Sequence, residues 1–179
     1  MKKPGVLFYA VICCFALASV VVAAGDLVAL RQADMKVIAA GTKTISGMFK
    51  EPATYSSAEF KRAADAIRDK SGDVLIGHFA VEAADPKSKA KPNIVEERER
   101  FDRLANDLKA YATALDKAAD KNPAAMMESM RMKPGEPMGG GPFGTHVRDE
   151  AQLSSIPAEH AFHLMLQTCT TCHSRFRMD

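Results

Sequence analysis

The residues best suited to do chemistry lie near the C-terminus, in the run Cys169-Thr170-Thr171-Cys172-His173. Two thiols can add across the two vinyl groups of a haem, and an imidazole beside them can ligate the iron. On a helix, Cys169, Cys172 and His173 fall on one face, because they are spaced i, i+3 and i+4. The pattern therefore predicts one covalently bound haem c, held by Cys169 and Cys172, with His173 as the proximal axial ligand of the iron.

A Cys-x-x-Cys pair also occurs in redox dithiols, in zinc sites and as a structural disulfide. A redox dithiol is expected near a βαβ pattern, which the sequence does not show. A zinc site needs further ligands, but the other two cysteines, Cys13 and Cys14, lie in an N-terminal apolar segment. The histidine directly after Cys172 favours haem attachment, and a disulfide stays as the main alternative. Because the motif lies near the C-terminus, a second axial ligand must come from upstream.

The N-terminus has the pattern of an export signal. Two lysines precede an apolar run that ends in small residues, as in secretory signal peptides. We expect cleavage after Ala24, which makes residues 1–24 a signal peptide and residues 25–179 a single domain in the periplasm. An uncleaved membrane anchor is the alternative, since the run approaches the length of a spanning helix. Only in that case would the protein contact a membrane.

Charge and composition exclude some function classes. The chain carries 24 basic and 22 acidic residues, a formal net charge of +2. Removal of residues 1–24 would take away two lysines and no acidic residue. The remaining domain would be formally neutral, whereas nucleic-acid binding requires a basic patch. No nucleophile–base constellation or paired-carboxylate site is apparent, so we expect a protein that is not an enzyme.

Apolar residues recur at helical spacing through residues 25–179, and strand signals are nearly absent, which indicates an all-α protein. Four amphipathic helices are predicted: 26–50, one that starts at 56, one from 93 to about 120, and a last one that carries the haem motif. Four helices with one buried stripe each pack most simply as an up-down bundle. The fold class predicted is therefore an all-α four-helix up-down bundle.

Local signals predict where two of the helices begin and where one ends. Ser56 and Glu59 have the spacing of a capping box at the start of the second helix. Ser155 is the expected N-cap of the last helix, with Pro157 in its first turn. Gly72 is expected to bend or end the second helix.

Residues 122–153, between the third and fourth helices, are predicted to form an irregular insertion rich in methionine and glycine. Its methionines are Met126, Met127, Met130, Met132 and Met138. Clustered thioethers together with His146 could bind Cu(I), which prefers soft ligands. The alternative is a loop in which the methionines make adaptable apolar contacts.

The sequence resembles the class II c-type cytochromes, the four-helix-bundle family that includes cytochrome c′. The resemblance rests on Leu30-Arg31-Gln32 with Met35-Lys36, on residues 90–94, and on residues 169–177, which read Cys-x-x-Cys-His-x-x-Phe-Arg. It departs from the family at Val95, where an aromatic residue is common, at Leu166, where a glycine is common, and in the insertion.

The resemblance implies one of two functions for the haem. In one branch of the family a methionine of the first helix completes a low-spin His/Met site, and the protein carries electrons. In the other branch the sixth position is open, and NO or CO can bind. Met35 occupies the matching position, and we expect it to be the distal axial ligand of an electron carrier with transient redox protein partners. A gas-binding protein with five-coordinate iron is the alternative, and homodimer formation is compatible with either.

Other charged and histidine residues are candidates for the haem environment. Arg31 lies one turn before Met35 and Arg177 one turn after His173, so both are predicted to contact the haem propionates or the haem pocket. His78 and His146 are rival distal ligands. The remaining histidines, His160 and His163, share the helix of His173 and are expected to lie on the surface or rim.

Overall fold

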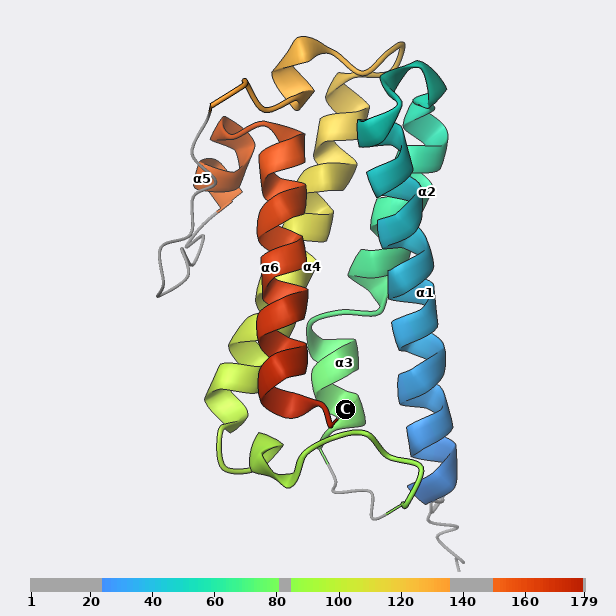
Figure 1. Cartoon of the computed structure of the whole chain (residues 1–179), viewed down its shortest axis with the longest axis vertical. Coiled ribbons are helices and arrows are strands. Elements are labelled where there is room, and N and C mark those ends of the chain that lie inside the picture. Colours follow the sequence, from blue (N-terminus) through green and yellow to red (C-terminus); the bar gives the residue numbers. More distant parts are fainter. Residues whose placement is uncertain (1–23, 81–84, 136–149, 179) are drawn as a thin grey trace, which may run out of the picture.

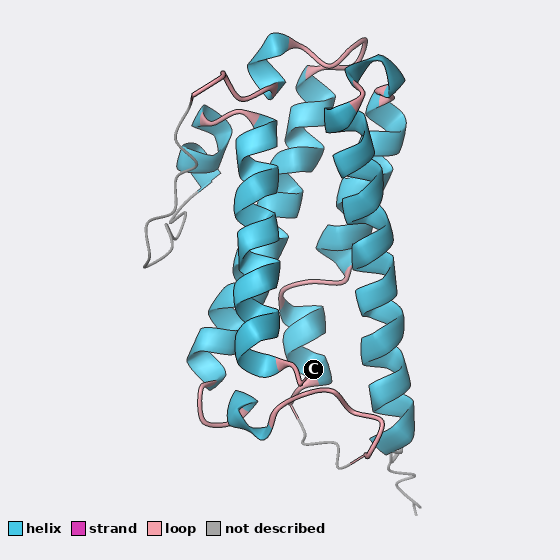
Figure 2. Ribbon diagram, in the orientation of Figure 1, coloured by secondary structure: helices cyan, strands magenta, loops and turns pink. Residues whose placement is uncertain are grey.

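The computed structural model describes residues 24–80, 85–135 and 150–178, which form a bundle of four long helices (Figures 1 and 2). The long helices are α1 (Ala24–Lys50), α2 (Ser57–Asp69), α4 (Arg98–Lys121) and α6 (Ala158–Phe176). Shorter elements are α3 (Asp73–His78), α5 (Glu150–Ser155) and three 3₁₀ turns: Pro52–Thr54, Pro92–Ile94 and Glu128–Met130. The long helices run alternately up and down in Figure 1, so the predicted all-α bundle is confirmed.

The predicted N-cap is confirmed for the second predicted helix and is wrong for the last one. The Ser56 side chain accepts a hydrogen bond from the backbone N–H of Glu59 at 3.4 Å, and α2 begins at the next residue. Ser155, in contrast, is the last residue of α5, and Pro157 is the residue that precedes α6. The prediction that Ser155 caps the last helix was wrong, because its hydroxyl donates back to the Gln152 carbonyl at 2.8 Å within α5.

The second predicted helix is divided in two at Gly72. This glycine has φ 58°, a left-handed conformation that side chains disfavour. Its N–H donates to the carbonyl of Ala105 in α4 at 3.0 Å. The turn therefore ends α2 and starts α3 against α4.

The apolar side chains form two separate clusters. The large core cluster lies between α1, α2, α4 and α6 and includes Ile45, Phe60, Ile67, Leu115 and Met165, all essentially inaccessible to solvent. Close approach of helices is part of this packing. A Cβ atom on Gly41 of α1 would lie only 2.8 Å from the carbonyl oxygen of Ala63 in α2. Packed apolar side chains and this close helix contact thus fill the interior of this part of the bundle.

The small core cluster joins α3 to the start of α4 and the end of α6. Its members are Leu75, Ile94, Phe101, Leu104, Ala105 and Phe176. The Phe101 ring meets that of Phe176 edge-on, with centroids 5.5 Å apart. Side chains of α1 and α6 meet in the large core cluster, where the ring centroids of Phe49 and Phe162 lie 5.5 Å apart. The backbones of these two helices seldom come close, whereas α4 packs closely on both α2 and α6.

The segment predicted to be an irregular insertion contains short helical pieces in its described parts. Residues 128–130 form a 3₁₀ turn, and α5 begins at Glu150, within the predicted range of 122–153. Met130 is buried in the large core cluster, and Met126 packs against the same cluster. These two methionines therefore have a structural role.

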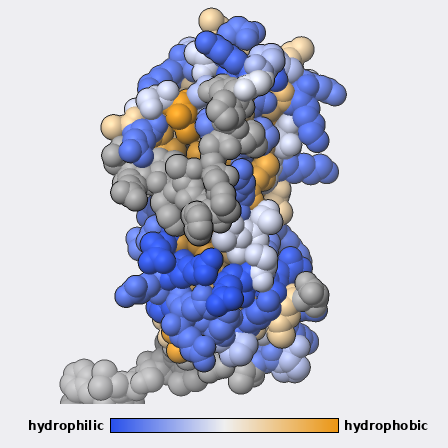
Figure 3. Space-filling model, turned by 60° about the vertical axis from the view of Figure 1, so that its left-hand side comes forward, coloured by the Kyte–Doolittle hydropathy of each residue, from blue (hydrophilic) through white to orange (hydrophobic). Residues whose placement is uncertain are grey.

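The visible surface is mostly hydrophilic, with apolar side chains confined to small areas among polar ones (Figure 3). Among the described residues, no helix combines the length and the apolar character that crossing a membrane requires. The predicted signal peptide, residues 1–24, lies almost wholly outside the described residues.

Candidate haem site

The two cysteines of the motif lie at the boundary between the two core clusters. Cys169 packs against the large core cluster and Cys172 against the small one. Met35 of α1 is half-buried and packs against both clusters. The structure therefore brings Met35 of α1 and the two cysteines of α6 to the same junction.

Both cysteines are free thiols in a desolvated environment. Burial raises the pKa of Cys169, and it raises the pKa of Cys172 to about 11, with a contribution from the neighbouring Cys169. Reactive redox cysteines and zinc ligands work as thiolates, for which the pKa must be low. The surroundings therefore do not favour a redox dithiol or a zinc site.

His173 follows on the same helix and is exposed. Partial desolvation of its ring lowers its pKa, and the positive charge of Arg177 lowers it further. The neutral imidazole, which is the form that can ligate a metal, is therefore favoured near neutral pH.

The end of α6 is held by the chain that precedes α4. The Lys91 N–H donates to the Phe176 carbonyl at 2.8 Å, and the Met178 N–H donates to the Lys89 carbonyl at 2.7 Å. Arg175 donates from Nε to both carboxylate oxygens of Glu97, at 2.8 and 2.9 Å. We call these contacts the α6 clamp, and they fix the last turn of the motif helix. Glu97 was not among the candidate residues identified from the sequence, so its role was missed.

Arg31 is buried, at 7 % exposure. Its Nε and Nη2 donate to the backbone carbonyl of His78 at 2.8 and 2.6 Å, and its guanidinium lies 4.1 Å from the centroid of the Phe79 ring. Arg177 is exposed, and its backbone N–H donates to the His173 carbonyl at 3.0 Å. Pairing of Arg31 or Arg177 with a haem propionate stays a prediction.

A buried carboxylate that the sequence did not single out lies beside Met35. Asp34 is only 3 % exposed. One of its oxygens accepts from Lys70 Nζ at 2.9 Å, and the other lies 2.9 Å from His78 Nε2. Burial acts to raise the pKa of Asp34, but the hydrogen bonds from Lys70 and His78 outweigh it, and the pKa falls below its ordinary value.

The rival histidine ligands separate into different environments. His78 is the last residue of α3 and its ring is engaged with Asp34. His160 and His163 lie on α6 and are half-buried, and both ring nitrogens of His160 are buried, so the expectation of a surface position is wrong for His160. His146 and Met138 lie outside the described residues. The copper hypothesis is therefore untested, and no group of three or more His, Cys, Asp or Glu residues suited to a metal ion occurs in the described part of the chain.

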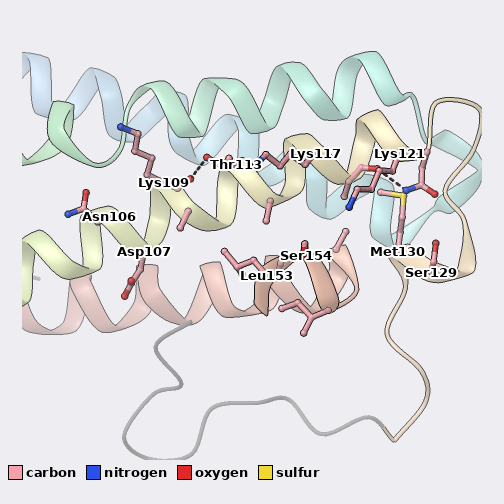
Figure 4. A pocket seen from close by; sticks show the side chains of 17 residues that line it. Asn106, Asp107, Lys109, Thr113, Lys117, Lys121, Ser129, Met130, Leu153 and Ser154 are labelled. Carbon is pink, nitrogen blue, oxygen red and sulfur yellow. Dashed lines mark hydrogen bonds between the residues drawn. The ribbon is translucent and has the colours of Figure 1, made fainter. Parts of the chain in front are cut away.

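An open groove of about 680 Å³ lies elsewhere, between α4, α5, α6 and the turn at Met130 (Figure 4). Lys109, Lys117 and Lys121 of α4 and Leu153 of α5 are among the residues that line it. Neither Cys169 nor Cys172 contributes to the groove, which is therefore distinct from the haem site.

The residues at the junction suit a covalent haem. Two half-buried free thiols lie on one face of α6, a neutral imidazole follows them, and the apolar side chains of two clusters lie on either side. Cys169 and Cys172 would hold the haem, and the bound iron would supply a centre for ligand binding or electron transfer.

Comparisons with known proteins identify the family of the chain. A family model described as cytochrome c′ matches residues 26–135, a range that does not include the cysteine motif itself. A search of curated protein sequences found no significant match. The structural neighbours include cytochrome c′ from Shewanella frigidimarina, with 18 % identity and a TM-score of 0.61, over 87 % of this chain and 97 % of that one.

Two further neighbours are similar over comparable lengths. Cytochrome c′ from Thermochromatium tepidum has 20 % identity and a TM-score of 0.61, over 88 % of this chain and 99 % of that one. A mutant of Rhodopseudomonas palustris cytochrome c′ has 26 % identity and a TM-score of 0.58, over 86 % of this chain and 98 % of that one. The family carries covalent haem c, and Cys169 and Cys172 fit its Cys-x-x-Cys-His motif. The chain belongs to the cytochrome c′ family and is a monohaem c-type cytochrome.

Proposed function

We propose that this cytochrome binds small neutral gases such as NO and CO at a five-coordinate haem iron. In this proposal Cys169 and Cys172 form the thioethers, His173 is the proximal ligand, and Met35 is an apolar side chain over the distal face. The polarity and steric access of a distal pocket decide between gas binding, oxygen activation and electron transfer.

The observation that carries the proposal is the environment of one turn of α1. The charged side chains of this turn, Arg31 and Asp34, are directed to α2 and α3, where His78 and Lys70 bind them. Met35 is the side chain of this turn that packs against both apolar clusters. The side chain that α1 offers to the haem site is therefore an uncharged thioether, which suits a neutral diatomic ligand.

Two of the structural neighbours lend support through their known ligands. Variants of the cytochrome c′ of Alcaligenes xylosoxidans are described with bound NO and with bound CO. They share 17 % and 18 % of their sequence with this chain, so the fold is the property held in common. The transfer of their gas binding to this protein is part of our proposal.

The expected His/Met electron carrier is the second candidate, because the thioether of Met35 is itself a good iron ligand and is already half-buried at the site. The comparisons favour gas binding over this first expectation. In either case we place the mature protein in the periplasm after removal of residues 1–24. An electron carrier would in addition need transient redox protein partners.

Visible spectra of the purified haem protein separate the two candidates. Gas binding predicts a high-spin spectrum without CO and prompt formation of a CO adduct after reduction. Met35→Ala should leave the iron high-spin and raise the CO association rate by about tenfold, since a side chain that obstructs the distal face is removed. A low-spin wild-type spectrum that becomes high-spin in Met35→Ala would overturn the proposal and establish Met35 as a ligand.

A further inference from the structure

We propose that Asp34 is a positioning residue for the distal face: with Lys70 and His78 it holds the α1 turn that carries Met35, and so limits how readily a gas reaches the iron. The inference rests on the proposed gas binding at this haem. Neither Asp34 nor His78 belongs to the haem motif; the sequence did not single out Asp34, and it offered His78 only as a rival distal ligand.

The contacts of Asp34 join α1 to two other helices. Asp34 and Met35 are consecutive residues of α1, so contacts that fix the position of Asp34 also restrain Met35. The Asp34 carboxylate bridges the Nζ of Lys70, at the end of α2, and the Nε2 of His78, at the end of α3, both at 2.9 Å. A single buried carboxylate thus ties α1 to the ends of two other helices.

Arg31 adds a second link between α1 and His78, through the backbone carbonyl of the histidine instead of its ring. It donates two hydrogen bonds to the backbone carbonyl of His78, at 2.8 and 2.6 Å. The side chain of His78 therefore engages Asp34 while its carbonyl engages Arg31, one turn apart on α1. Hydrogen bonds with a charged partner are stronger than neutral ones, and buried networks of this kind resist displacement.

The Asp34 network is one of several contacts that fix α1 at this level, beside the Gln32 Nε2 hydrogen bond to the Lys87 carbonyl at 3.3 Å and the packing of Met35 on both clusters. α1 packs closely on α2 and also contacts α3, whereas its backbone seldom comes close to that of α6, which carries the cysteines. The attachment of α1 to α2 and α3 therefore contributes to the separation between Met35 and the haem face. Among these attachments, the Asp34 network lies directly beside Met35.

The test compares Asp34→Asn with a matched control in the holoprotein. Asp116 of α4 is also buried and also bridges two cations, Lys61 and Arg68, but it ties α4 to α2 within the other half of the bundle. We expect Asp34→Asn to raise the CO association rate of the reduced protein by about three- to tenfold, because Met35 can then move aside more easily. Asp116→Asn should leave this rate within twofold of the wild type.

Two milder variants separate positioning from a direct effect of charge and guard against failure of Asp34→Asn to fold. Lys70→Met removes a positive charge, whereas Asp34→Asn removes a negative one. A positioning role predicts that both raise the CO association rate, and that His78→Gln does so too. An electrostatic effect on the iron would move the rate in opposite directions in Asp34→Asn and Lys70→Met, and that result would overturn the inference.

Amide hydrogen exchange supplies a readout that does not depend on the gas. Exchange over residues 31–38 should become faster in Asp34→Asn and Lys70→Met than in Asp116→Asn. Unchanged CO kinetics in all three network variants, Asp34→Asn, Lys70→Met and His78→Gln, would refute the positioning role. If the wild type instead proves low-spin and ligated by Met35, the proposed function fails. The positioning role then predicts that Asp34→Asn weakens the thioether-to-iron charge-transfer band while Asp116→Asn keeps it, and an unchanged band contradicts it.

Discussion

The two halves of this bundle are completed in different ways. Around the large core cluster, α1, α2, α4 and α6 bury their side chains against one another, and Gly41 allows α1 to approach the backbone of α2. Around the small core cluster, Met35 of α1 and Cys172 of α6 pack against the apolar side chains, and polar contacts and the α6 clamp hold the helix ends. The first half is thus stabilised by its own side chains, whereas a haem attached to Cys169 and Cys172 would complete the second.

The largest effect is expected when the haem is removed. In Cys169→Ser/Cys172→Ser neither thioether can form, so the purified protein should lack covalent haem. Amide exchange should rise strongly in α3 and at the start of α4, because this half loses the group that completes it, and should change little around the large core cluster. The doubly substituted Thr170→Ser/Thr171→Ser protein is the control on the same helix. Equal loss of protection in both halves would show that the halves are not independent.

Two leucine truncations, one in each core cluster, test the difference between the two halves, and we expect effects of intermediate size. Leu115→Ala in the large core cluster should cost about 3 kcal/mol of unfolding free energy both with and without haem, because its surroundings are complete in either state. Leu75→Ala in the small core cluster should cost a similar amount with haem but well under half of that without it. Chemical denaturation of the holoprotein and of the Cys169→Ser/Cys172→Ser protein measures both. A full cost for Leu75→Ala in the haem-free protein would contradict the comparison.

The smallest effect concerns the α6 clamp. The pKa of Glu97 is lowered chiefly by the hydrogen bond from Arg175, so the folded state binds a proton less readily than the unfolded state. The clamp therefore stabilises the fold above the unfolded pKa of a glutamate, about 4.3, and this contribution is lost as the pH falls through the lower folded value. Thermal unfolding of Glu97→Gln should show a small destabilisation at neutral pH that disappears in strong acid. A pH-independent difference would assign the effect to packing instead of charge.

The sequence allowed the fold class, the up-down order of the helices and the cysteine motif to be predicted, because helical periodicity and the Cys-x-x-Cys-His spacing are local signals. The division at Gly72 and the start of α6 after Pro157 were only partly anticipated. The buried network of Arg31, Asp34 and His78 was not, because it joins residues more than forty positions apart, with a separation of 44 residues between Asp34 and His78. Glu97 was hidden for the same reason, since its partner Arg175 lies 78 residues away.

The central claim, that a covalent haem completes the half of the bundle around Met35, is tested most directly by peptide mass mapping of the protein expressed with c-type maturation machinery. We predict one haem on the peptide that contains Cys169 and Cys172 and none elsewhere. A colourless protein with both thiols unmodified would contradict the account.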